Sequence, residues 1–532
     1  MAKGSASEGY LAIVLHAHLP FVRHPEYENF LEERWFFEAM TETYIPLIKL
    51  LGRAASENVG FKLAISLSPT LLAMMEDTLL QERYVKHLDK LIELSSREQE
   101  RNRNNPHCRW LAEVYGGLFK EARDIFTGCN CRLSAPFKQL HAAGFVELIT
   151  TSATHGVLPF LITQPKAAHA QIAEGVAYFE SVFGFRPQGF WLPECAFSPG
   201  LDALLAKEGI RYFFVESHGI FNAVPAPRYG VNAPIYTASG VAAFGRDQLS
   251  TEEVWSARKG YPGDPAYREF YRDIGHDLDL DYIRPYIAGD VRVDTGIKYY
   301  RITGKGSHKE LYHPDAAREK AAQHAGNFLH KRIGHIEHLH SRMGRPPIIV
   351  APFDAELFGH WWFEGPQWLD FLIRKTVYDQ NTIELTTPAA FLDRHPVHQA
   401  GVPSVSTWGH KGYFEVWLNG KNDWIYPHLF ECARRMQNIV NGAAPTPSAI
   451  IKRALNQCAR ELLLAQSSDW PFIINGGTAT AYATRRFKDH VSRFHFLADA
   501  IENKSISPDH LQVIEHIDNI FPDIDYRVFI KS

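Results

Sequence analysis

The chain has 532 residues, of which 45% are hydrophobic and 22% charged, and its formal net charge is −4. This length indicates one large barrel-type domain with a smaller one, or three ordinary domains, in a soluble globular protein with a substantial core. The small negative charge argues against a nucleic-acid surface and against a polybasic membrane anchor.

The six cysteines are too few and too scattered for a disulfide framework. Cys129 and Cys131 lack a second closely spaced pair, so we expect free thiols rather than a structural zinc site, consistent with a reducing cytoplasm. The N-terminus has no long apolar segment typical of a signal peptide, and no stretch is long enough to span a membrane. These features predict a cytoplasmic protein.

Short apolar runs recur along the first 390 residues and predict buried strands. They lie at residues 10–15, 62–67, 146–150, 189–192, 211–215, 241–244, 348–350 and 383–386. Helical patterns separate many of them, at residues 32–51, 167–183, 314–343 and 367–378. Such alternation predicts a parallel sheet, and polar residues follow strand after strand, as in an α/β barrel whose site lies at the carboxyl ends of its strands.

Two insertions and a second domain complete the expected organisation. Residues 1–400 are predicted to form the barrel, with a helical insertion at about 75–135. A Pro/Gly/Ala-rich stretch at 217–239 is long enough to be a functional lid. Beyond residue 401 helical patterns dominate, at 427–443, 448–466 and 481–501, and predict an α-helical C-terminal domain that contributes to the substrate groove.

Two acidic residues each follow a short apolar strand among aromatic residues: Glu194 in FWLPECAF and Asp354 in PFDAELFGHWW. A pair of carboxyl groups is the minimum for glycosidic chemistry, in which one attacks the sugar or activates water and the other protonates the leaving oxygen. Aromatic rings would cover the apolar faces of pyranose units. Alternatively, either carboxylate pairs with a basic residue, and Asp354 caps a helix.

Histidines and a third acid leave further alternatives open. His16 and His18 are two positions apart and share one face of an extended strand, a spacing compatible with metal ligation or with hydrogen bonds to sugar hydroxyls. No further compact ligand set accompanies them, which favours substrate contact over metal. Asp469, in SSDWPF, either caps a helix or touches a ligand. Phosphate-loop, dinucleotide and serine-hydrolase motifs are absent from the sequence.

Four motifs, spaced in order along the chain, resemble those of glycoside hydrolase family 57, and in particular of its 1,4-α-glucan branching enzymes. They are HAHLP at His16–Pro20, VELITTSATHGVLP at Val146–Pro159, WLPECAF at Trp191–Phe197 and FDAELFGHWW at Phe353–Trp362. WLNGKNDWIYPHL and SSDWPF extend the resemblance into the C-terminal part.

The resemblance implies an incomplete (β/α)7 barrel and a retaining double displacement that needs no metal or cofactor. Glu194 occupies the nucleophile position and Asp354 the general acid/base position. Arg258, Gly275, Trp408 and Asp469 fall at substrate-contacting positions, and Trp417 at that of a glucan-stacking tryptophan. Within the quoted motifs, the predicted substrate contacts are His16, His18, His155, Trp191, His360 and Trp361. Tyr229 and Tyr236 are the two candidates for a lid tyrosine that covers the site.

The expected activity is therefore the branching of an α-1,4-glucan such as amylose or a glycogen-like polymer, with no nucleic-acid or membrane partner. An amylase or 4-α-glucanotransferase of the same family is the nearest alternative. A metal-dependent carbohydrate deacetylase or α-mannosidase-like enzyme that uses His16 and His18, and a non-catalytic glycan-binding protein, are alternatives from other classes.

Overall fold

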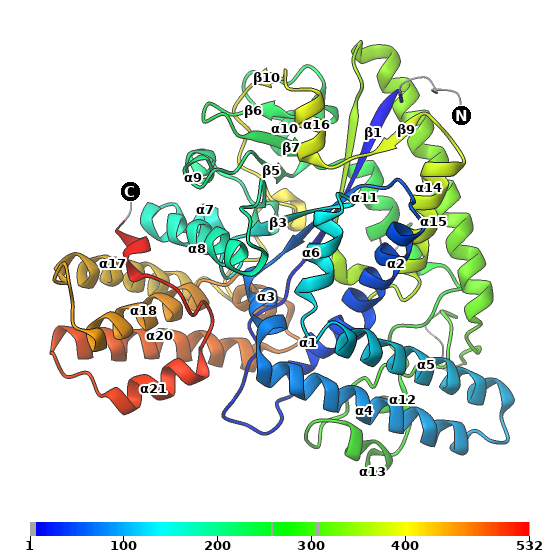
Figure 1. Cartoon of the computed structure of the whole chain (residues 1–532), viewed down its shortest axis with the longest axis horizontal. Helices are drawn as coiled ribbons and strands as arrows, with labels where there is room; N and C mark the ends of the chain where they lie inside the picture. Colours follow the sequence, from blue (N-terminus) through cyan, green and yellow to red (C-terminus); the bar gives the residue numbers. More distant parts are fainter. Residues whose placement is uncertain (1–6, 257–258, 305, 307, 531–532) are drawn as a thin grey trace.

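The computed structural model describes residues 7–256, 259–304, 306 and 308–530. One sheet runs through the centre of the molecule (Figure 1). Its strands in the described residues are β1 (Gly9–Ala17), β2 (Leu63–Leu67), β3 (Val146–Thr151), β4 (Gly189–Trp191), β5 (Tyr212–Val215), β6 (Ile235–Tyr236), β7 (Ala242–Gly245), β8 (Ile348–Asp354), β9 (Ile383–Leu385) and β10 (Gln399–Ala400).

The sheet is an incomplete barrel, as predicted. In the described part of the chain, seven parallel strands follow one another in the spatial order β7-β5-β4-β3-β2-β1-β8. The ring of strands is open between β7 and β8, which do not pair with each other. Near this opening the amide of Asp247 donates a hydrogen bond to the carbonyl of Val350 at 2.8 Å. Because all seven strands run in one direction, their carboxyl ends lie on one face of the barrel.

Helices connect the parallel strands and cover the outside of the sheet (Figure 1). Those of the barrel are α1 (Glu33–Ala39), α2 (Ile45–Ser56), α3 (Pro69–Glu76), α6 (Ser134–Ala142), α7 (Leu158–Leu161), α8 (Pro165–Phe183), α9 (Leu201–Lys207), α10 (Ser217–Phe221), α11 (Gln248–Trp255), α14 (Pro314–Met343), α15 (Gly365–Tyr378) and α16 (Pro388–Arg394). A π-helical turn, η1 (Met40–Tyr44), joins α1 to α2 in what the sequence predicts as one uninterrupted helix.

Between β2 and β3 the long helices α4 (Thr78–Arg101) and α5 (Pro106–Gly128) pack side by side and project from the barrel (Figure 1). The short helices α12 (Ile274–Asp277) and α13 (Leu280–Ile283) lie in the irregular stretch between β7 and β8. The C-terminal residues form α17 (Ile425–Gly442), α18 (Ala449–Ala465), α19 (Asp469–Gly476), α20 (Thr480–Glu502) and α21 (Pro508–Ile517). These C-terminal helices form a compact group on one side of the barrel (Figure 1).

The stretch 217–239, which the sequence predicts to be a lid loop, contains regular structure. It contains α10, a 3-10 turn at Gly230–Asn232, and β6, which pairs antiparallel with β7 and parallel with β10. Both β6 and β10 have only two residues, too few to give a period-two pattern in the sequence. Backbone pairing therefore fixes the end of this stretch against the barrel.

All six cysteines lie in the described residues and are free thiols, with Cys108, Cys195, Cys432 and Cys458 buried. In the same residues, no helix combines the length and apolar character needed to cross a membrane.

Candidate active site

The carboxyl ends of the barrel strands carry the side chains that the sequence singles out. His16 on β1 lies opposite Asp354, the last residue of β8, in the parallel register of the two strands. Glu194 follows β4 in a 3-10 turn, and His155 follows β3. These four residues come from segments far apart in sequence, and the strand order places them at the same face of the barrel.

Glu194 is held in a strained backbone conformation by hydrogen bonds on both its main chain and its side chain. Its φ is +63°, in the left-handed region that residues other than glycine rarely adopt. Its carbonyl accepts from the amide of Trp408 at 3.1 Å and from Thr407 Oγ1 at 2.9 Å. Its carboxylate accepts from Trp408 Nε1 at 2.9 Å and from Ser468 Oγ at 3.1 Å. Such strain, enforced by the surroundings, is typical of functional sites.

The pKa of the Glu194 carboxyl is raised to about 7, because burial disfavours its charged form. The hydrogen bonds from Trp408 and Ser468 and the charge of His18 act in the opposite direction and favour the carboxylate. Glu194 therefore titrates near neutral pH, and the groups that surround it decide how much of it is ionised.

Asp354 is the more strongly perturbed of the two acids. Burial raises its pKa well above the ordinary range, and the neighbouring charges of Glu356 and Glu194 raise it further, while Arg246 lowers it. Its side chain makes no helix-capping hydrogen bond, so the capping alternative for Asp354 is wrong. A carboxyl that keeps its proton near neutral pH can act as a general acid.

A chain of hydrogen bonds runs from β2 to Glu194. Ser66 Oγ lies 3.1 Å from His16 Nδ1, His16 Nε2 lies 2.9 Å from His155 Nε2, and His155 Nδ1 lies 2.8 Å from Ser468 Oγ. An ionised Glu194 only accepts, so Ser468 donates to it and accepts from His155 Nδ1–H. With its proton on Nδ1, neutral His155 can only accept at Nε2, so His16 donates to it through Nε2–H. His16 Nδ1 then accepts from the Ser66 hydroxyl.

The electrostatics of the two histidines agree with this assignment. Burial lowers the pKa values of both His16 and His155 well below the ordinary range, and the charge of His18 lowers them further. Both rings are therefore neutral at neutral pH, each with one donor and one acceptor nitrogen, as the chain of hydrogen bonds requires. These contacts use both ring nitrogens of His16 and of His155 within the protein.

His18 and Asp469 form a charged pair beside this chain. His18 Nε2 lies 3.1 Å from Asp469 Oδ2, and its ring stacks on His155 with centroids 3.8 Å apart. Burial lowers the pKa of His18, but the charge and hydrogen bond of Asp469 outweigh it, so the net pKa is raised. Asp469 is the first residue of α19 and its side chain also accepts from Ser467 Oγ, so it links the C-terminal helices to the barrel.

Three polar residues of the site are missed by the sequence reasoning. Glu356 accepts from Tyr44 Oη and, at 3.2 Å, from the amide of His18, and burial raises its pKa. Arg246 follows β7, binds Glu216 at 2.9 Å and lies 5.7 Å from the centre of the Trp408 ring. Ser468 joins His155 to Glu194. Glu356 and Ser468 belong to the motifs quoted above. Arg246 comes soon after the predicted strand at 241–244, and a search for polar residues that follow predicted strands would have found it.

The predicted aromatic contacts occupy different depths. Trp191 is fully buried and stacks on His16 at 4.6 Å between ring centroids. Trp408 is half-buried beside Glu194, whereas Trp361 is 53% exposed and stacks on Phe270 at 4.8 Å. His360 binds Glu42 through Nδ1 at 2.7 Å. Of these rings, that of Trp361 is the one most available to a polymer at the surface.

Trp417 does not present the exposed face that glucan stacking needs. Its side chain is 2% exposed and packs with Val157 and Ala196, and a Cβ on Gly409 would lie 2.6 Å from its ring. The predicted stacking contact is therefore not available in this structure. Trp417 is instead part of the buried apolar cluster against which Trp408 packs.

Tyr229 and Tyr236 lie at the wrong end of the barrel to cover the site. Tyr236 pairs with Ala242, the first residue of β7, so it lies at the amino ends of the strands. The Tyr229 ring lies 5.9 Å from the guanidinium of Arg345, which precedes β8. The lid prediction for both tyrosines is wrong, because the antiparallel β6 returns the chain to the face opposite the carboxyl groups.

Gly275 is buried and packs closely on the backbone of Val293, whose carbonyl oxygen would lie 1.9 Å from a Cβ at this position. This contact explains a requirement for glycine by packing alone. Arg258 lies outside the described residues.

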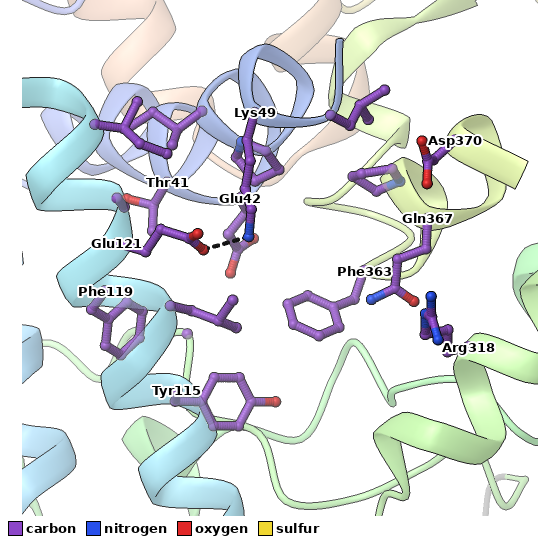
Figure 2. Close-up of a pocket in the computed structure, with 18 of the residues that line it drawn as sticks. Thr41, Glu42, Lys49, Tyr115, Phe119, Glu121, Arg318, Phe363, Gln367 and Asp370 are labelled. Atoms are coloured by element: carbon purple, nitrogen blue, oxygen red, sulfur yellow. Dashed lines mark hydrogen bonds and ion pairs between the residues drawn. The ribbon is translucent and has the colours of Figure 1, made fainter. Parts of the chain in front are cut away.

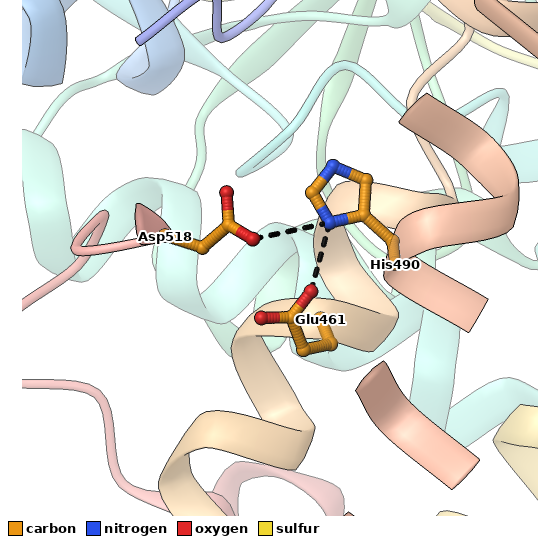
Figure 3. A group of neighbouring side chains, drawn as sticks. All are labelled: Glu461, His490 and Asp518. Carbon is orange, nitrogen blue, oxygen red and sulfur yellow. Dashed lines mark hydrogen bonds and ion pairs between the residues drawn. The ribbon is translucent and has the colours of Figure 1, made fainter. Parts of the chain in front are cut away.

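In the described residues, one group of three metal-ligand types has its donor atoms within 4.8 Å of one another: Glu461, His490 and Asp518 (Figure 3). Arg493 Nη1 lies 2.6 Å from Asp518 Oδ2, and Arg486 Nη2 lies 3.6 Å from Asp518 Oδ1. The two guanidinium groups balance the charges of the two acids, so we interpret this group as a buried charge network and not as a metal site. The ring of Trp470 lies next to it, with its centroid 6.2 Å from that of His490.

Comparison with known proteins gives two family matches. The model described as "Glycosyl hydrolase family 57" matches residues 12–403, and the one described as "1,4-alpha-glucan branching enzyme, C-terminal" matches residues 428–529. The chain is 34% identical over 525 residues to a 1,4-alpha-glucan branching enzyme of Thermococcus kodakarensis, covering 93% of this chain and 74% of that protein.

Two solved structures are similar over nearly the whole chain. The alpha-amylase AmyC from Thermotoga maritima is 43% identical with a TM-score of 0.93, and the match covers 98% of this chain and 99% of that one. The family 57 branching enzyme from Pyrococcus horikoshii is 33% identical with a TM-score of 0.89, and the match covers 99% and 97%.

Proposed function

The chain belongs to glycoside hydrolase family 57, and on that premise we propose that it is a 1,4-α-glucan branching enzyme. The family model covers residues 12–403, which include the barrel. A separate model of the branching-enzyme C-terminus covers residues 428–529, which include the C-terminal helices. As an enzyme of this family it acts on α-glucans by retaining glycosyl transfer. The observation that carries the finer assignment is that the branching-enzyme C-terminal model covers residues 428–529, and that the 34% identity to a branching enzyme covers 93% of the chain.

In this proposal Glu194 is the nucleophile and Asp354 the general acid/base. Glu194 attacks the anomeric carbon of an α-1,4 linkage and forms a covalent glucosyl-enzyme, while Asp354 gives its proton to the departing chain. Asp354 then takes the proton of the acceptor as the acceptor oxygen displaces Glu194. When the acceptor is a 6-hydroxyl of a second glucan, an α-1,6 branch results.

The surroundings of the two carboxyl groups support these roles. The raised pKa of Asp354 keeps the acid protonated, and the charge of Glu194 contributes to that rise, so the two groups interact. The hydrogen bonds of Trp408 and Ser468 and the charge of His18 favour the ionised Glu194 that attack requires. Different environments thus separate an acid from a nucleophile in one site.

We assign substrate contact to the more accessible residues around these acids: His18, His360, Trp361, Trp408 and Asp469. His16, His155 and Trp191 are buried, and we assign them the role of positioning these groups. We divide the chain into a catalytic barrel over residues 1–400 and a helical domain over residues 401–532, with Trp408 and Asp469 supplied to the site by the latter. The substrate is an amylose-like or glycogen-like polymer, and the process is storage-glucan synthesis in the cytoplasm, in line with the free cysteines.

The second candidate is an α-amylase, because the AmyC structure is 43% identical to this chain. The two activities share the glucosyl-enzyme and differ in whether a glucan hydroxyl or water accepts the sugar. Incubation with amylose followed by proton NMR separates them. Branching predicts new α-1,6 linkages, whereas hydrolysis without such linkages would favour the amylase.

Replacement of Glu194 by Gln tests the nucleophile. The expected result is loss of both transfer and hydrolysis with glucan binding retained, since the amide keeps the size of the side chain but cannot attack. Glu319→Gln, at an exposed position of α14, is the matched control and should behave like the unaltered protein. Turnover by the Glu194→Gln protein would refute the assignment.

A further inference from the structure

A cavity of about 300 Å³ lies outside the site described above (Figure 2). Its wall is formed by the π-helical turn η1 and α2 on one side, by α5 on another, and by α15 with the residue stretch before it. The size is at the lower end of the range of small-ligand pockets, about 300–1,000 Å³. Nothing in the proposed reaction uses this space.

Aromatic rings form much of the wall. Tyr115, Phe119 and Phe363 face the space, and the Phe363 ring stands near its middle (Figure 2). The guanidinium of Arg268, which also lines the cavity, lies over the Phe363 ring at 3.8 Å from the ring centre. Flat apolar faces of this kind suit the C–H faces of a pyranose ring.

Charged residues of both signs surround these rings. Lys49 and Glu121 pair at 2.7 Å, and Arg53 and Asp370 pair at 2.6 Å. Glu42 adds a third acid, which pairs with Arg268 at 3.8 Å, and Arg318 adds a further guanidinium to the lining. An anionic ligand would meet the acids and a cationic ligand the guanidinium groups, so the lining fits an uncharged ligand rich in hydroxyls.

One polar atom on the wall has no partner. Gln367 Oε1 is buried and, among the described residues, accepts no hydrogen bond, although its side chain lines the cavity (Figure 2). A buried acceptor without a donor is costly and is rare in folded proteins. The nitrogen of the same amide points toward the Phe363 ring (Figure 2), so Nε2 is the atom of Gln367 that can donate to a ligand hydroxyl in the cavity.

The cavity also touches the proposed active site through η1. Glu42 lines the cavity and binds His360 Nδ1 through its own carboxylate at 2.7 Å, and Tyr44 in the same turn donates to Glu356. π-Helical turns within α-helices frequently mark functional positions. A glucan bound at the surface near His360 and Trp361 is therefore close to the cavity, because Glu42 contacts His360 and also lines the cavity.

We propose that this cavity is a second glucan-binding site, which takes a short α-1,4-linked segment of the polymer. The proposal rests on the proposed function, because it takes α-glucan as the substrate. The rings hold the apolar faces of the sugar, the Gln367 amide nitrogen donates to a hydroxyl, and the mixed charges of the rim bind the remaining hydroxyls. Binding there retains the polymer next to the site without entering the reaction.

Isothermal titration calorimetry with maltotetraose tests this in the Glu194→Gln protein, which binds without turnover. We expect two classes of site, and we expect Gln367→Leu, which removes the amide with little change in size, to weaken one class about tenfold or more. Gln323→Leu, on the exposed face of α14, is the control and should keep both classes. Leu118→Trp, at the partly exposed mouth, should block the same class without disturbing the core.

The outcomes separate this inference from the proposed function. One class of site in all four proteins, or two classes unchanged in both cavity variants, would overturn the second site and leave the branching activity unaffected. Absence of α-1,6 linkages in the NMR assay would instead remove the branching activity while the second class of site could still be measured. Loss of one class in both Gln367→Leu and Leu118→Trp, with Gln323→Leu unchanged, would support the inference.

Discussion

The hydrogen bond from Trp408 Nε1 to Glu194 Oε2, 2.9 Å long, gives a direct way to test how the site controls the proposed nucleophile. Trp408→Phe keeps an aromatic ring and removes the donor. Because this bond favours the carboxylate, its loss should raise the pKa of Glu194 above its value of about 7. The acid limb of the profile of kcat/KM against pH should then move to higher pH, since that profile reports the groups of the free enzyme.

The size of the change follows from the structure. A hydrogen bond to a charged group contributes about 1.5–3 kcal/mol, and one pKa unit corresponds to 1.36 kcal/mol, so a full loss would raise the pKa by about 1–2 units. Trp408 is half-buried, and water can replace part of the lost bond. We therefore expect the acid limb to move upward by about one pH unit.

The assay is the initial rate of glucan cleavage between pH 5 and pH 9 at substrate concentrations well below KM. Trp368→Phe is the control, because Trp368 is fully buried and its Nε1 has no hydrogen-bond partner among the described residues. It should lower stability and leave the midpoint unchanged. An acid limb that stays in place, or moves to lower pH, in Trp408→Phe would refute the reasoning, whatever happens to the absolute rate.

Three further predictions concern other groups. Glu356→Gln removes the charge that helps to raise the pKa of Asp354, so the alkaline limb of the same profile should move down by about one pH unit, and an unchanged limb would exclude this coupling. Burial raises the pKa of Glu174 to about 8, so between its ordinary pKa and pH 8 only the unfolded chain has lost this proton, and the stability of the fold decreases across that range. Glu174→Gln should therefore gain about 1–2 kcal/mol in urea denaturation at pH 9 relative to pH 5, and equal gains at both pH values would contradict this. Gly275→Ala should cost about 1–3 kcal/mol in the same assay because its Cβ would meet the Val293 carbonyl, whereas weaker glucan binding at unchanged stability would indicate a substrate contact instead.

The sequence predicts the seven parallel strands because each is an apolar run long enough to be recognised, and it predicts the two acids because each follows such a run. β6 and β10 escape prediction because two-residue strands carry no pattern and form only against a neighbour already in place. The same short strands make the lid prediction wrong, since their pairing directs Tyr236 to the amino end of β7.

Local sequence thus determined which residues are placed at strand ends, because strand length and polarity are properties of a few neighbouring positions. Only the tertiary structure decided which of them meet. The hydrogen-bond chain from Ser66 through His16, His155 and Ser468 to Glu194 joins residues up to 452 positions apart, and burial of these side chains sets the protonation of the histidines. Hydrogen bonds and desolvation depend on three-dimensional neighbours, which no local pattern contains.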